Sequence, residues 1–164
     1  MEGCLGASNS GSVSPETVRR WIVNVENVLS THVGRQKFQD FLQNCNGFEE
    51  GIQLITFWEM CHNLVPDEEI ISKKRKKKRW YSSQKEVDEA VFNQANEILS
   101  FANENINVDP GHLERISSAI ENKNYKQLMS SIFEVKKEAG LLLERYHGLF
   151  KENLLQQQGF THSS

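Results

Sequence analysis

Long apolar runs are absent from this sequence of 164 residues. A membrane-crossing helix needs about 18 or more consecutive apolar residues, and no stretch of the chain comes near that length. The beginning of the chain also lacks the basic and apolar segments of a secretory signal peptide. We therefore expect a cytoplasmic protein.

Cysteine is scarce as well. Cys4, Cys45 and Cys61 are odd in number, widely separated and without a Cys-x-x-Cys pair. This spacing favours neither a disulfide framework nor a zinc site, and the histidines are likewise scattered without the spacing of a metal cluster. No hydrolase or kinase motif accompanies them. The sequence therefore predicts a reducing compartment, no metal, no cofactor and no catalytic residues.

A broad excess of positive charge is also missing, because the formal net charge is -3. Nucleic-acid binding over a whole surface needs many Lys and Arg side chains to neutralise phosphates. We therefore expect no specific nucleic-acid partner.

Positive charge is instead gathered in one basic run. It consists of Lys73, Lys74, Arg75, Lys76, Lys77, Lys78 and Arg79, and Trp80 and Tyr81 follow it. Like charges at this density repel one another, which favours an exposed insertion over residues 67–83. The alternatives are a nuclear-localisation patch and a contact with anionic lipid or nucleic acid, of which the two aromatic residues favour a peripheral contact with a membrane.

Apolar residues recur at intervals of three and four, the spacing that places them on one face of a helix. Ser14, Pro15 and Glu16 begin the first helix, because they supply a cap, a first-turn proline and an acidic residue at the positive helix end. We expect one stripe from Val18 to Leu29, an end at Gly34 and a second helix from about Arg35.

Further helices are predicted at residues 54–64, 87–102, 113–120 and 125–149, the last either continuous or interrupted near Phe133. No segment has the alternation of a β-strand. Residues 1–13 are assigned to a flexible leader and residues 154–164 to a frayed tail. The sequence thus predicts an all-α, irregular helical bundle over residues 14–153.

A series of residues in this bundle resembles the opening half of a regulator-of-G-protein-signalling (RGS) domain. The series is Trp21, Glu26-Asn27, Gly34, Phe38, Phe41-Leu42, Phe57-Trp58 and Cys61. Residues 106–109 resemble the family's loop between its fifth and sixth helices, and residues 133–150 its closing helices. The resemblance implies about nine helices, with a four-helix bundle beside a subdomain formed by the terminal helices.

The resemblance also implies a function. An RGS domain binds the switch regions of an activated heterotrimeric Gα subunit and accelerates its GTP hydrolysis. Because Gα supplies its own arginine finger, the domain favours the transition-state arrangement and adds no nucleophile. We accordingly expect a monomeric GTPase activator whose partner is Gα.

The family contacts Gα through three loops, which correspond here to Gln53, Leu54, Asn107, Asp109, Glu144 and Gly148. Asn107 matches the asparagine whose amide touches the switch region, and Glu144 keeps an acidic position. Leu54 replaces a polar residue and Gly148 an arginine. Losing a polar hot-spot contact costs about 2 kcal/mol or more, so the resemblance implies weakened or atypical activity.

Two other functions remain open on the residues alone. Leu54 and Gly148 favour an RGS-like scaffold that binds a partner other than Gα, and the basic run favours a module directed to lipid or to the nucleus. Asn107 has an alternative role as well, since asparagine side chains often bond to nearby backbone and shape a loop.

Overall fold

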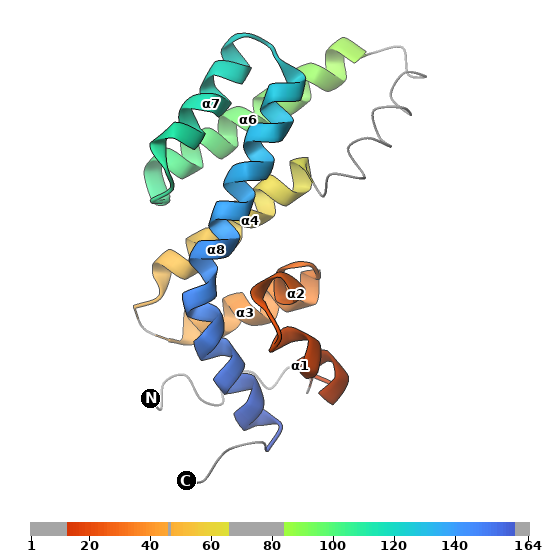
Figure 1. Ribbon diagram of the computed structural model, residues 1–164, viewed down its shortest axis with the longest axis vertical. Helices are drawn as coiled ribbons and strands as arrows, with labels where there is room; N and C mark the ends of the chain where they lie inside the picture. Colours follow the sequence, from red (N-terminus) through yellow and green to blue (C-terminus); the bar gives the residue numbers. More distant parts are fainter. Residues whose placement is uncertain (1–12, 46, 66–83, 160–164) are drawn as a thin grey trace. The chain divides into compact units, whose positions relative to one another are not determined.

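The computed structural model describes residues 13–45, 47–65 and 84–159 (Figure 1). They form seven α-helices: α1 (Pro15–Trp21), α2 (Val25–Leu29), α3 (His32–Asn44), α4 (Glu49–Leu64), α6 (Gln84–Asn105), α7 (Pro110–Glu121) and α8 (Tyr125–Gln157). No strand occurs in these ranges, which confirms the all-α prediction. The count of about nine helices is not confirmed by the part of the chain described. None of the described helices is both long enough and apolar enough to cross a membrane.

Several predicted segments lie outside the described residues. They are all of the leader except Val13, the insertion 67–83 with its basic run, and residues 160–164 of the tail. The remainder of the predicted tail is not frayed, because α8 continues to Gln157 with Leu154 buried. Just beyond the helix, Gln158 Nε2 donates to the Val13 carbonyl oxygen at 2.8 Å.

Polar side chains begin five of the helices, including α8, where Asn124 accepts from the Gln127 N–H at 3.1 Å. Ser14 caps α1 by accepting from the Thr17 N–H, and Asn24 caps α2 by accepting from the Asn27 N–H at 2.8 Å. Thr31 and Asp109 play the same part for α3 and α7. Each cap satisfies a backbone N–H that has no partner within its own helix. The start predicted at Ser14 and Pro15 is therefore confirmed.

The single stripe predicted from Val18 to Leu29 is divided between α1 and α2, because Asn24 starts a new helix within it. The prediction that Gly34 ends a helix was wrong, since Gly34 lies in the first turn of α3. A Cβ atom built there would come within 2.1 Å of the Val28 carbonyl oxygen. This glycine therefore permits a close approach of the α3 backbone to α2 and does not mark a helix end.

The described residues divide into two compact units. The first takes the described residues up to Ile55 and those from Gly140 onward, and the second takes residues from Thr56 to Ala139. Helices α4 and α8 therefore contribute residues to both units.

Phe150 of α8 is the centre of the core of the first unit. Its ring lies 4.9 Å from that of Phe38, 5.5 Å from that of Phe41 and 6.3 Å from that of Trp21. The neighbouring His147 is also buried and donates from Nε2 to the Trp21 carbonyl oxygen at 2.6 Å. Together these contacts hold α1 and α3 against the C-terminal part of α8.

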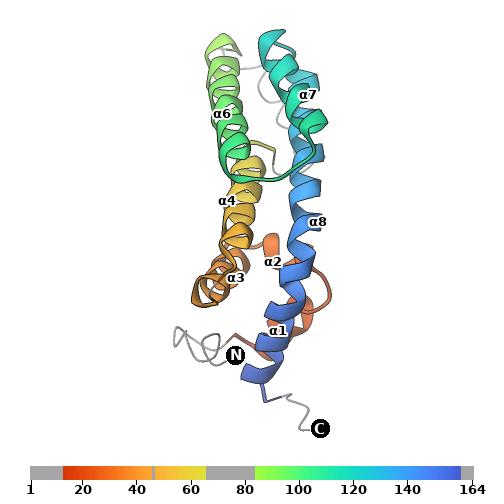
Figure 2. The same ribbon diagram turned by 90° about the vertical axis from the view of Figure 1, so that its left-hand side faces the viewer.

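The second unit takes helical segments from α4, α6, α7 and α8, and α6 and α7 lie side by side in both views (Figures 1 and 2). The rings of Phe57 and Phe101 are stacked with centroids 6.4 Å apart. Lys136 is buried here, and its Nζ donates to the Val65 carbonyl oxygen at 2.9 Å and lies 5.4 Å from the centroid of Trp58. The carbonyl just beyond α4 and the aromatic face thus stabilise a buried cation.

Several helices extend further than their sequence patterns predicted, and α6 and α8 matter most for the site. Helix α6 continues through Asn105, three residues beyond the predicted end at residue 102. Helix α8 runs without interruption from Tyr125 to Gln157, which makes the interrupted alternative near Phe133 wrong. The continuity of α8 decides where the predicted contact residues Glu144 and Gly148 lie.

Candidate functional site

The loop of residues 106–109, between α6 and α7, is the first part of the candidate site. The Ile106 N–H donates to the Ala102 carbonyl oxygen at 3.0 Å, which continues the hydrogen bonding of α6 into the loop. Val108 is 6% exposed and anchors the middle of the loop in the core. Asn107, between these two residues, is exposed.

The other end of this loop is held by Asp109. Its Oδ1 accepts from the Gly111 N–H at 2.8 Å and its carbonyl oxygen from the His112 N–H at 3.0 Å, so Asp109 caps α7. Its own backbone N–H donates to Oε1 of Glu138 in α8 at 2.8 Å. Oε2 of Glu138 pairs with Nδ1 of His112.

Asn107 takes no part in this bonding. Its side chain has no hydrogen-bonding partner among the residues that the structure describes. The loop-shaping role considered for Asn107 is filled by Asp109 instead. An exposed amide that is not used internally is free to donate to, and accept from, a partner molecule.

Glu144 and Gly148 form the second part of the candidate site, on α8. The resemblance placed them at a loop, whereas both lie inside the continuous helix, four residues apart and exposed. Side chains with this spacing share one helix face. A Cβ built at Gly148 meets nothing within 4 Å, so this position is an open and flat point of the face.

Leu141 lies on the same face and was missed by the sequence reasoning. Its side chain is 65% exposed, although it is large and apolar. Leu141, Leu142 and Leu143 are consecutive in a helix, so they cannot all face the same core. That pattern was the available indication that one leucine points outward.

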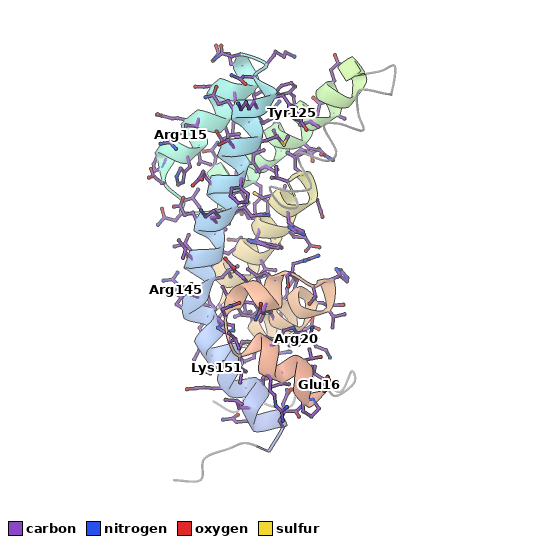
Figure 3. The ribbon with its side chains drawn as sticks, turned by 45° about the vertical axis from the view of Figure 1, so that its right-hand side comes forward. Glu16, Arg20, Arg115, Tyr125, Arg145 and Lys151 are labelled. Atoms are coloured by element: carbon purple, nitrogen blue, oxygen red, sulfur yellow. The ribbon has the colours of Figure 1, made fainter. Side chains whose placement is uncertain are left out.

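Charged side chains flank this face. Arg145 donates from Nη2 to Oε2 of Glu50 at 2.6 Å and is itself largely exposed. Figure 3 labels Arg145 and Lys151 along α8, and Lys151 is exposed as well. A single exposed apolar side chain among charged residues is ordinary on a protein surface, and here it is also accessible to a partner molecule.

Gln53 and Leu54 do not belong to a loop. Both lie within α4, which begins at Glu49, and Leu54 is 1% exposed. Its expected contact with a partner is therefore corrected, since a buried core side chain cannot reach another molecule. Gln53 is half-buried and remains at the surface of α4.

The six predicted residues do not all fall in one unit. Asn107 and Asp109 belong to the second unit, and the other four belong to the first. The predicted basic patch, Lys73 to Arg79, lies outside the described residues. The structure thus supports two local surfaces, the 106–109 loop and the α8 face with Leu141, Glu144 and Gly148.

Metal-binding and nucleophilic chemistry find little support. No group of three or more His, Cys, Asp or Glu residues within the described ranges is arranged to hold a metal ion. Cys61 is a free, fully buried thiol, and burial raises its pKa while the Lys136 charge opposes the shift. A buried thiol of this kind is inert as a nucleophile.

Cys45 differs from what the cysteine spacing predicted, since it is disulfide-bonded. Sequence spacing alone cannot show which cysteines meet in a fold. The disulfide bond of Cys45 therefore does not agree with the reducing compartment that the cysteine spacing predicted.

Comparison with known proteins adds no assignment to this geometry. No protein-family model matches the chain, and neither a curated protein nor a solved structure shows significant similarity to it.

Proposed function

We propose that this protein binds the switch segments of an activated heterotrimeric Gα subunit through the 106–109 loop, and accelerates GTP hydrolysis weakly. The observation that carries the proposal is the exposed Asn107 amide, which has no internal bond and lies between Ile106, bonded to the end of α6, and the buried Val108. The rigid loop presents this amide without a large entropic cost on binding.

Three further features support the proposal. The residues from Trp21 to Cys61 follow the order that resembles an RGS domain. One compact unit combines both ends of the chain, and the other takes segments from four helices, as in that family's two subdomains. The exposed Leu141 and Glu144 offer a second contact surface on α8.

In this mechanism the protein contributes no catalytic residue. Gα holds the nucleotide and an arginine finger, while the bound module favours the switch arrangement of the transition state. Leu54 is buried within α4 and Gly148 lacks a side chain, so neither position supplies the polar contact that the resemblance implies, which accounts for weak acceleration. This function places the protein in the cytoplasm, where disulfides are rare, so the bonded Cys45 is at odds with the placement.

A scaffold that binds a different protein is the second candidate. It is favoured by the burial of Leu54 and by the absence of a side chain at Gly148, because both positions lack the polar groups that a Gα contact would use. In that case the exposed Leu141 face would be the main binding surface.

The test is binding of the purified protein to a panel of Gα subunits carrying GDP, with and without aluminium fluoride as a transition-state mimic. We expect tighter binding to the fluoride-loaded form of at least one subunit, and faster single-turnover GTP hydrolysis. Asn107→Ala should weaken that binding by about 30-fold, the equivalent of a hot spot of roughly 2 kcal/mol.

Asn96→Ala is the matched control, because Asn96 is an exposed asparagine on α6 outside the loop. It should leave both binding and hydrolysis unchanged. Absence of binding to every subunit, or an equal loss in both variants, would reject the Gα proposal and favour the scaffold.

A further inference from the structure

Glu138 in α8 bonds to two residues at the junction between the 106–109 loop and α7. One carboxylate oxygen accepts from the Asp109 backbone N–H, and the other pairs with His112 in the first turn of α7. The Glu138 and His112 side chains are each 23% exposed, so water competes for this pair only in part. A carboxylate that accepts a backbone N–H forms one of the stronger classes of hydrogen bond.

The position of this bond matters for Asn107. On one side of Asn107, Ile106 bonds to the end of α6, and on the other side Val108 is buried. The next backbone N–H, that of Asp109, is the one that Glu138 holds. Among the described residues, the side chain that restrains the backbone next to Asn107 from a different helix is therefore that of Glu138.

We propose that Glu138 is a positioning residue, which restrains the 106–109 loop so that the Asn107 amide is presented to the partner in one conformation. The effect on binding rests on the proposed Gα function, while the restraint of the loop rests on the geometry alone. Removing the carboxylate leaves the Asp109 N–H without its partner, and the loop then has to be ordered during binding.

The chain allows this role to be separated from a charge effect. Glu138→Gln keeps a carbonyl oxygen that accepts from the Asp109 N–H and an amide group that can donate to His112, but removes the negative charge. Glu138→Ala removes both bonds. A positioning role predicts that the Gln variant behaves like the parent and the Ala variant does not.

The first measurement needs no partner. Amide hydrogen exchange, followed by NMR for the whole chain, should become at least about tenfold faster at Asp109 in Glu138→Ala, because a charge-assisted bond is lost. Exchange at Asp109 in Glu138→Gln should stay near the parent rate. Amides in the middle of α6 and α7 serve as controls and should not change in either variant.

The second measurement is a double-mutant cycle on binding to the fluoride-loaded Gα subunit. Glu138→Ala should weaken binding by about tenfold in the parent, the order expected for ordering a loop residue. In the Asn107→Ala background the same substitution should weaken it by less than about threefold, because the two residues act through one contact.

The outcomes separate the two proposals. If no Gα subunit binds the parent protein, the proposed function fails, and the exchange measurement alone decides whether Glu138 restrains the loop. Unchanged exchange at Asp109 in Glu138→Ala, or faster exchange throughout α6 and α7, overturns the positioning role. Additive losses in the double-mutant cycle overturn its link to Asn107.

Discussion

The hydroxyl group of Tyr146 in α8 is hydrogen-bonded to one carboxylate of α4. It donates to Oε2 of Glu50 at 3.0 Å, and Arg145 donates to the same oxygen. Burial raises the pKa of Tyr146 above its ordinary value, and the hydrogen bond to Glu50 and the charge of Glu50 raise it further, against the opposing effect of Arg145. The folded protein therefore holds the phenolic proton more tightly than the unfolded chain does.

This shift predicts a loss of stability at alkaline pH. Because the folded-state pKa is raised, the contribution of Tyr146 is fully present below the unfolded value of about 10 and is lost as pH rises through the folded pKa. Tyr146→Phe should reduce the fall in the free energy of unfolding between about pH 9 and pH 11. Denaturant unfolding at several pH values measures this, and identical pH dependence in the two proteins would contradict the assignment.

At the scale of elements, the contact between α2 and α3 sets a strict limit on side-chain size. Thr31 caps α3 by accepting from the Gly34 N–H at 3.0 Å, and the same turn lies against the Val28 carbonyl oxygen. Arg35 is buried beside it and donates to the Leu29 carbonyl oxygen at 2.7 Å, which satisfies the C-terminal end of α2. These bonds require the backbones to stay close.

Two glycine substitutions test this limit. Gly34→Ala should lower the free energy of unfolding by roughly 1–3 kcal/mol or more, because the new Cβ would overlap backbone that cannot move aside easily. Gly148→Ala in α8 meets open space and should raise it by about 0.5–1 kcal/mol, the usual gain for alanine in a helix. Denaturant unfolding of both variants gives the comparison, and a neutral Gly34→Ala would show that α2 and α3 do not meet as described.

At the scale of the whole molecule, residues from both ends of the chain build one core. Phe150 is 2% exposed and contacts rings from α1 and α3. Gly51 of α4 lies in the same unit, and a Cβ there would come within 3.0 Å of Leu42 and 3.3 Å of Tyr146. Large aromatic side chains therefore fill the core of this unit, and a glycine occupies the position where they leave little space for another side chain.

Truncation of Phe150 should be among the most damaging single changes. Phe150→Ala removes a buried ring and should lower the free energy of unfolding by about 3–5 kcal/mol. Leu141→Ala, on the exposed face of the same helix, should change it by less than about 0.5 kcal/mol. Chemical denaturation distinguishes the two, and similar values for both variants would place Phe150 outside the core.

The sequence by itself determined the all-α class, the start of α1 at its Ser14 cap and the surface loop that carries Asn107. These follow from apolar spacing and from side chains that bond within one helical turn, so local residues are sufficient. The sequence also placed Asp109 in that loop, although its capping of α7 emerged only with the backbone geometry.

Only the tertiary structure decided which side chains meet over long separations. The resemblance placed Leu54 at a contact loop, whereas its apolar spacing placed it in the helix predicted at 54–64, and its burial within α4 agrees with the spacing. Gly148 and Glu144 lie on a continuous α8 because that helix packs along both of its halves, and Glu138 reaches Asp109 across 29 positions. Such contacts depend on the packing of distant segments, which overrides local preference and has no sequence spacing of its own.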